Sequence, residues 1–217
     1  TIKDMIPKII HFCWLSGDPF PKDIALCLES WKKHLQDYEL WLWGKTPEDN
    51  LGLKIVERSF DLDSVVWCKQ AFEAKKYAFA ADYIRFWALY NYGGIYLDSD
   101  VEALNSFDAF LDANSFIGFE YLNIPEAAVL GCEKGCKWIK DCLDWYEGKC
   151  FISETGELKN DVVPLLVKNI LEKNYQRKIE DNGKIQTLEG LVLYPYYYFS
   201  PKNYFNGKIK IRKVEDL

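Results

Sequence analysis

Two carboxylates separated by one small residue stand directly after a short apolar run near the middle of the chain. Asp98 and Asp100 flank Ser99, and the preceding Ile95–Leu97 has the pattern of a buried strand. Alternate residues of a strand face the same side, and a turn at Ser99 would also let both side chains reach one point. Like charges this close need a cation between them, and hard oxygen ligands suit Mg²⁺ or Mn²⁺. These residues predict a divalent-metal and phosphate site; the alternative is a solvated turn after an edge strand.

A second pair of charges lies in the helical segment that leads into the acidic pair. No Gly or Pro interrupts residues 69–92, so we predict one helix there. Its second half is apolar on every face except at Asp82 and Arg85, which are three residues apart and share a face. Because unpaired buried charges are costly, these two side chains either pair with each other or with a neighbour to hold the helix, or reach into the site at Asp98 and Asp100. The short connection through Gly93-Gly94 favours the second interpretation.

The first part of the chain has the order of a βαβ unit. We predict a buried strand over Lys8–Trp14, a helix over Lys22–His34 and a second strand over Tyr38–Trp43. Ligands of such units gather beyond the carboxyl ends of the strands, and the loop after Trp14 lies at such an end. The Gly-x-Gly-x-x-Gly fingerprint is missing, so a nucleotide would not be held in the dinucleotide-binding manner.

The remaining predicted elements also alternate between strands and helices. They are a brief strand at Lys54–Glu57, a short helix at Phe107–Leu111, strands at Ser115–Glu120 and Ala127–Leu130, helices at Cys136–Tyr146 and Asp161–Asn174, the latter bent by Pro164, and a strand at Leu191–Tyr194. An aromatic cluster at 196–199 and alternating charged and aliphatic residues at Lys208–Arg212 follow. This order predicts an α/β fold with a central, mainly parallel sheet flanked by helices, in a single domain over 1–217.

Composition narrows the functional class. Hydrophobic residues make up 49% of the 217 residues and aromatic residues 16%, which is typical of a globular protein with a large core. The formal charge is −6, and this negative charge argues against a nucleic-acid-binding surface. Seven cysteines in no regular framework indicate reduced thiols, and hence a cytoplasmic protein, which could lie at the inner face of a membrane. Neither a signal peptide nor a transmembrane segment is predicted, while peripheral membrane attachment is left open.

Four blocks of sequence in this order resemble one family of enzymes. The blocks are Ile6–Trp14, Ser30–Lys32, Tyr77–Arg85 and Tyr92–Val101. Together they resemble glycosyltransferase family 32, whose sugar-binding region contains an Asp-x-Asp motif and which includes capsular polysaccharide and yeast mannosyl transferases. The resemblance covers residues 6 to about 125 and implies a GT-A-type, Rossmann-like fold. It also implies a UDP- or GDP-sugar donor, a saccharide acceptor, Mn²⁺ or Mg²⁺ as cofactor, and transfer with retention of anomeric configuration.

The resemblance further implies roles for the charged residues. Asp100 would bind the metal directly, while Asp98 would support the ion and contact the ribose or donor sugar. Asp82 and Arg85 would bind hydroxyls of the donor sugar, with Arg85 also near the diphosphate.

Three further residues of the matching blocks carry expectations of their own. Trp14 would stack on the nucleobase, against the alternative of a core or rim tryptophan. Tyr96 would line the same pocket, although a packing role is nearly as well supported. His11 we interpret as a core histidine with satisfied hydrogen bonds rather than a ligand.

One departure from the family pattern bears on the metal site. Family members continue into a segment with His-His and Ser-Trp that contributes to the metal and donor pocket, whereas this sequence ends at 214–217 without it. We therefore expect weak metal binding in a site that is open on one side.

Two other functional classes are alternatives to a transferase. One is a non-catalytic module that binds nucleotide-sugars or carbohydrates. The other is a phosphohydrolase of the haloacid dehalogenase type, which needs its Asp-x-Asp near the N-terminus and a late acidic pair that this sequence lacks.

Overall fold

A computed structural model describes residues 5–120, 123–160 and 163–201 of the chain. Within these residues one eight-stranded sheet has the order β3-β2-β1-β4-β6-β5-β8-β7. The strands are β1 (Ile9–Trp14), β2 (Glu39–Gly44), β3 (Ile55–Arg58), β4 (Gly94–Leu97), β5 (Ser115–Phe119), β6 (Pro125–Cys132), β7 (Gln186–Leu188) and β8 (Leu191–Tyr194). The α-helices are α1 (Lys22–His34), α2 (Val66–Glu73), α3 (Tyr77–Tyr92), α4 (Lys137–Trp145) and α5 (Val163–Tyr175).

The sheet is parallel on one side and mixed on the other. β1 pairs in parallel with β2 and β4, β2 with β3, and β5 with β8. β6 is antiparallel to both β4 and β5. The predicted α/β class with a mainly parallel sheet is confirmed. Because β6 runs against β4, its amino end lies at the same sheet edge as the carboxyl ends of β1 and β4.

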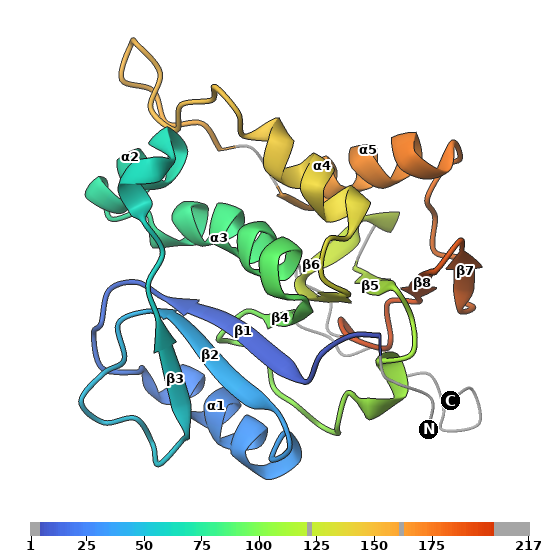
Figure 1. Ribbon diagram of the computed structural model, residues 1–217, viewed down its shortest axis with the longest axis horizontal. Helices are drawn as coiled ribbons and strands as arrows, with labels where there is room; N and C mark the ends of the chain where they lie inside the picture. Colours follow the sequence, from blue (N-terminus) through green and yellow to red (C-terminus); the bar gives the residue numbers. More distant parts are fainter. Residues whose placement is uncertain (1–4, 121–122, 161–162, 202–217) are drawn as a thin grey trace.

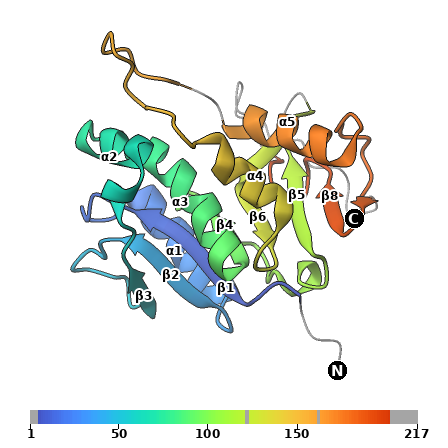
Figure 2. The same cartoon turned by 45° about the horizontal axis from the view of Figure 1, so that its top comes forward.

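Helices cover both faces of the sheet. Figures 1 and 2 show α1 on the face under β1, β2 and β3, with α2, α3, α4 and α5 on the opposite face. Each face has its own apolar core. One is built around Trp31 of α1 and Phe12 of β1, and the other around Phe86 of α3, Trp138 of α4 and Trp67 of α2.

Two glycines let the chain turn from α3 directly into β4. Gly93 and Gly94 have φ angles of 67° and 117°, which L side chains rarely adopt. A Cβ at Gly94 would lie 2.6 Å from the carbonyl oxygen of Ile9, and one at Gly93 would lie 2.7 Å from the backbone nitrogen of Lys134. The glycines therefore fix how closely the charged helix approaches the strand that carries the acidic pair.

The predicted single helix over residues 69–92 is wrong, because the structure has two helices there. α2 ends at Glu73, and Lys75 follows with a φ angle of 56°. The Lys76 N–H donates to the Ala71 carbonyl at 2.8 Å, and the Lys75 N–H donates to that of Phe72 at 2.9 Å. This is a helix-ending turn that usually carries glycine, so a lysine there gives no sequence signal.

Other predicted elements agree with the structure within a residue or two, with the exceptions that follow. The segment at 107–111 forms only a short 3₁₀ turn, Asp108–Phe110. β7 was not predicted. Pro164 lies in the first turn of α5, where its missing N–H breaks no helical hydrogen bond, so a bend at Pro164 is no longer expected. The start of the predicted helix at 161–162 and the segment Lys208–Arg212 lie outside the described residues.

No helix in the described parts of the chain is long and apolar enough to span a membrane. The seven cysteines are all free thiols. The cellular location of the chain stays a prediction.

Candidate active site

The carboxyl ends of β1 and β4 open into a pocket of about 410 Å³. Since the two strands are parallel neighbours, the residues that follow them meet at one edge of the sheet. The α3 residues on the facing side close the pocket. All six predicted site residues line this pocket: Trp14, Asp82, Arg85, Tyr96, Asp98 and Asp100. The rest of the lining is made by Cys13, Leu15, Ser16, Ile24, Tyr77, Ala78, Ala81 and Ser99.

Arg85 links the helix to both neighbouring strands. Its Nη2 donates to Asp98 Oδ1 at 3.0 Å and lies 3.5 Å from Asp82 Oδ1. Its Nη1 donates to the Ala127 carbonyl oxygen at 2.5 Å. The Arg85 side chain is only 6% exposed, so its charge depends on these partners. The two alternatives for the helix charges are therefore both realised: Asp82 and Arg85 are paired, and Arg85 reaches Asp98.

The acidic groups of the pocket differ in their surroundings. Burial in the pocket wall raises the pKa of Asp82 to about 7, with Arg85 opposing and Asp98 adding to the rise. Partial burial raises the pKa of Asp100, and the nearby Asp98 adds to it. A cation between Asp98 and Asp100 would relieve this repulsion.

The donor set fits a hard divalent cation. Both carboxylates come from the turn after β4 and line the same pocket, as predicted. In the described residues no cluster of three or more His, Cys, Asp or Glu could complete a protein-only metal cage. Two carboxylates with open positions suit Mg²⁺ or Mn²⁺, which keep waters and share phosphate oxygens of a substrate.

The two aromatic candidates occupy different depths. Trp14 is partly exposed at the rim, where its Nε1 donates to the Asp18 carbonyl oxygen at 2.8 Å and its ring lies 5.0 Å from that of Phe20. This leaves part of the indole free for stacking. Tyr96 is 2% exposed and lies beneath the guanidinium of Arg85, 4.5 Å from its carbon to the ring centre. Tyr96 thus supports Arg85 by a cation–π contact.

His11 is a core residue, as the sequence interpretation held. Its Nε2 donates to the Gly93 carbonyl oxygen at 2.8 Å, and its Nδ1 accepts from Trp43 Nε1 at 3.0 Å. The side chain is fully buried. This arrangement requires the neutral imidazole and excludes His11 as a ligand of the pocket.

A second chamber of about 450 Å³ adjoins the pocket across the Arg85 cluster. Both cavities share Asp82, Arg85 and Asp98, and the second adds Glu126 of β6 and Asn160. The Glu126 carboxylate accepts from the Ala128 N–H at 2.9 Å and from the Ser200 hydroxyl. Burial and the adjacent Glu126 raise the pKa of Glu120 to about 7.

Sequence reasoning missed Glu126 and Asn160. Glu126 directly precedes the predicted strand at 127–130, which is a weak signal. Only the antiparallel direction of β6 brings this end of the strand to the site, and that direction cannot be read from the residues.

The family model described as "Glycosyltransferase sugar-binding region containing DXD motif" matches residues 21–117. This range includes α3, the glycine turn and the acidic pair, but not Trp14 or Glu126.

Two curated fungal relatives match the chain over part of their length. Mannosyl phosphorylinositol ceramide synthase SUR1 of Saccharomyces cerevisiae is 29% identical over 89% of this chain and 48% of its own length. Inositol phosphoceramide mannosyltransferase 3 of Schizosaccharomyces pombe is 34% identical over 49% of this chain and 27% of its own. The chain thus spans about half or less of the relatives it matches.

Among solved structures, one titled PaToxG Glycosyltransferase has a TM-score of 0.60 at 20% identity, covering 79% of this chain and 70% of that one. At this identity the likeness concerns the fold alone.

The sheet, the glycine turn and the acidic pocket together define a GT-A-type glycosyltransferase fold. Residues 21–117 are similar to the sugar-binding region of this glycosyltransferase family, and Asp98-Ser99-Asp100 has the sequence of its DXD motif.

Because His11 is buried, we expect its pKa to be low. Desolvation lowers the pKa of His11 from 6.5 to about 4. As the pH falls, His11 is protonated in the unfolded chain before it is protonated in the folded one. The contribution of neutral His11 to the free energy of unfolding is therefore complete above pH 6.5. About 3 kcal/mol of it is lost as the pH falls to 4. Nitrogen-15 NMR of the imidazole should find neutral His11 with the proton on Nε2 at pH 5.5. Titration with a midpoint near 6.5 would contradict the buried assignment.

Proposed function

We propose that this domain transfers a sugar from a nucleotide-sugar donor to a saccharide or related hydroxyl acceptor, with a divalent metal and with retention of anomeric configuration. The observation that carries the proposal is the meeting of Asp98 and Asp100 with the Asp82–Arg85 pair in one pocket that has Trp14 at its rim. The anomer of the product, read by NMR, distinguishes retention from inversion.

The donor would lie along the pocket from rim to interior. The partly exposed Trp14 ring provides a flat face for the nucleobase. Asp82 and Arg85 lie deeper and provide acceptors and a donor for sugar hydroxyls. Because Arg85 is held by Asp98, Ala127 and Tyr96, its charge is fixed before the donor arrives. Such preorganised charge stabilises the negative charge that develops on the departing diphosphate.

Asp100, with Asp98 beside it, would hold the metal ion. When bound, Mn²⁺ or Mg²⁺ supplies positive charge to the diphosphate as the glycosidic bond to phosphate breaks. Asp98 would then serve both the metal ion and Arg85, because its Oδ1 already accepts a hydrogen bond from the guanidinium.

The acceptor would enter from the second chamber. A transferase needs its two substrates to meet at one point, and the two cavities meet at Asp82, Arg85 and Asp98. Glu126 and Asn160 offer hydrogen-bonding groups for hydroxyls there, and Phe79 offers an apolar face. Glu126 is tethered by the Ala128 N–H, so its position does not depend on the acceptor.

The names of the relatives suggest which substrates to test first. Both matched fungal proteins are named for mannosyl transfer to inositol phosphoceramide. GDP-mannose is therefore the first donor to compare with UDP-sugars, and myo-inositol is the first small acceptor.

Asp100→Ala should remove metal-dependent donor binding. We expect the affinity for GDP-mannose or the UDP-sugar that binds, measured by calorimetry with Mn²⁺, to fall about a hundredfold, or about 3 kcal/mol. The matched control is Asp37→Ala, an exposed carboxylate just before the amino end of β2 and therefore at the sheet edge opposite the pocket, which should bind as the wild type does. Equal affinity of Asp100→Ala and wild type, or wild-type binding that EDTA leaves unchanged, would refute a metal held by this motif.

Glu126→Ala should change how the bound donor is used. With myo-inositol as acceptor, we expect the ratio of transfer to donor hydrolysis to fall about tenfold, since one acceptor hydrogen bond is lost while the donor pocket stays intact. Glu154→Ala, at an exposed loop position, is the control. A parallel loss of transfer and hydrolysis would instead assign Glu126 to the donor or to folding.

A further inference from the structure

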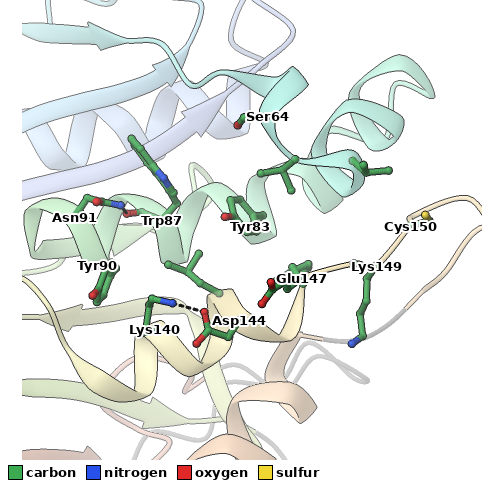
Figure 3. A pocket seen from close by; sticks show the side chains of 15 residues that line it. Ser64, Tyr83, Trp87, Tyr90, Asn91, Lys140, Asp144, Glu147, Lys149 and Cys150 are labelled. Atoms are coloured by element: carbon green, nitrogen blue, oxygen red, sulfur yellow. Dashed lines mark hydrogen bonds and ion pairs between the residues drawn. The ribbon is translucent and has the colours of Figure 1, made fainter.

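A groove of about 620 Å³ lies on the helical face of the molecule, apart from the pocket of the acidic pair. Figure 3 shows Tyr83, Trp87, Tyr90 and Asn91 of α3 along one wall, with Lys140 and Asp144 of α4 opposite. The groove shares no lining residue with the pocket of the acidic pair or with the adjoining chamber. It is therefore a separate site on another face of the same helix.

The aromatic rings of the groove are held from behind. Trp87 packs against Phe60 and Trp43, with ring centres 5.1 Å and 5.4 Å apart and nearly perpendicular planes. Tyr83 meets Tyr146 edge to face at 5.4 Å. Rings fixed in this way lose little freedom when a flat ligand stacks on them.

The groove also offers polar groups that the protein does not use. Six of the eight tryptophans donate their indole N–H to a protein acceptor, whereas Trp87 does not do so in the described residues. The Tyr90 hydroxyl and the Glu147 carboxylate likewise have no hydrogen bond to the described part of the chain, and both line the groove. Asn91 donates to the Trp87 carbonyl oxygen at 2.8 Å, which leaves its own oxygen as an acceptor.

The charges of the groove are already compensated. Lys140 pairs with Asp144 on α4, and Lys149 lies over the Trp145 ring at 4.5 Å. The two lysines of the lining are balanced in number by two carboxylates, those of Asp144 and Glu147, so the formal charge of the lining is zero. The groove therefore has no excess of positive charge to attract a phosphate or another anion, and the chemistry favours a neutral ligand rich in hydroxyl groups.

We propose that this groove is a second carbohydrate-binding site, which takes a neutral oligosaccharide. The apolar faces of its sugar rings stack on Tyr83, Trp87 and Tyr90, and its hydroxyls bond the Trp87 N–H, Asn91 and Glu147. Binding here is independent of the donor pocket, so it stands or falls separately from the proposed transferase activity.

The test measures binding of maltotriose, cellotriose and α-mannotriose to the full chain by tryptophan fluorescence and saturation-transfer NMR. We expect at least one of the three to bind with a Kd of about 10 mM or tighter. Trp87→Phe, which keeps a ring but loses the N–H, should weaken that binding about tenfold, and Tyr90→Ala should do the same without touching the Trp87 packing. Trp145→Phe is the matched control, because its N–H is also unpaired among the described residues but Trp145 does not line the groove.

Two comparisons separate the groove from the donor pocket. Asp100→Ala should bind the trisaccharide as tightly as the wild type, and a nucleotide with Mn²⁺ should not compete. The proposal is overturned if none of the three sugars binds, if Trp87→Phe and Tyr90→Ala both bind like Trp145→Phe, or if nucleotide displaces the sugar.

Discussion

A buried guanidinium needs partners, and the arrangement of the site depends on how Arg85 meets that need. Its side chain is 6% exposed and is bound by Asp98, Asp82 and the Ala127 carbonyl. Removing one member of a buried ion pair leaves an uncompensated charge and costs about 3–5 kcal/mol. The same contacts that compensate the charge of Arg85 tie α3 to the turn after β4 and to the start of β6. The contacts of Arg85 therefore determine both the packing of α3 and the geometry of the site.

The backbone brings these partners together at the edge of the sheet. Gly93 and Gly94 turn the chain from α3 into β4 at a point that has no room for a side chain. Asp98, four residues after Gly94, therefore lies beside α3 and within hydrogen-bond distance of Arg85. The parallel pairing of β1 with β4 brings Trp14 to the same edge, and the antiparallel β6 adds Glu126. Two cavities therefore meet at one ionic cluster, and the proposed transfer between two substrates would take place there.

The local parts of this site could be predicted from the sequence, and the long-range parts could not. The acidic pair, the charged positions of the apolar helix and the glycine turn each have a signal within a few residues. The break between α2 and α3 has no such sequence signal, because Lys75 occupies the left-handed position at which glycine is usual. Glu126 and Asn160 were missed because strand direction and order decide their place. The groove was missed because a helix that is apolar on nearly every face predicts buried side chains, whereas Tyr83, Trp87 and Tyr90 are partly exposed in the structure.

The most direct measurement is a double-mutant cycle on the unfolding free energy with Arg85→Met, Asp98→Asn and the double variant. If the buried guanidinium organises the site through Asp98, the two substitutions should be coupled by about 2–3 kcal/mol, with the double variant more stable than the sum of the single losses implies. Additivity within about 0.5 kcal/mol would mean that the two side chains act independently and that something other than this pair holds the site together.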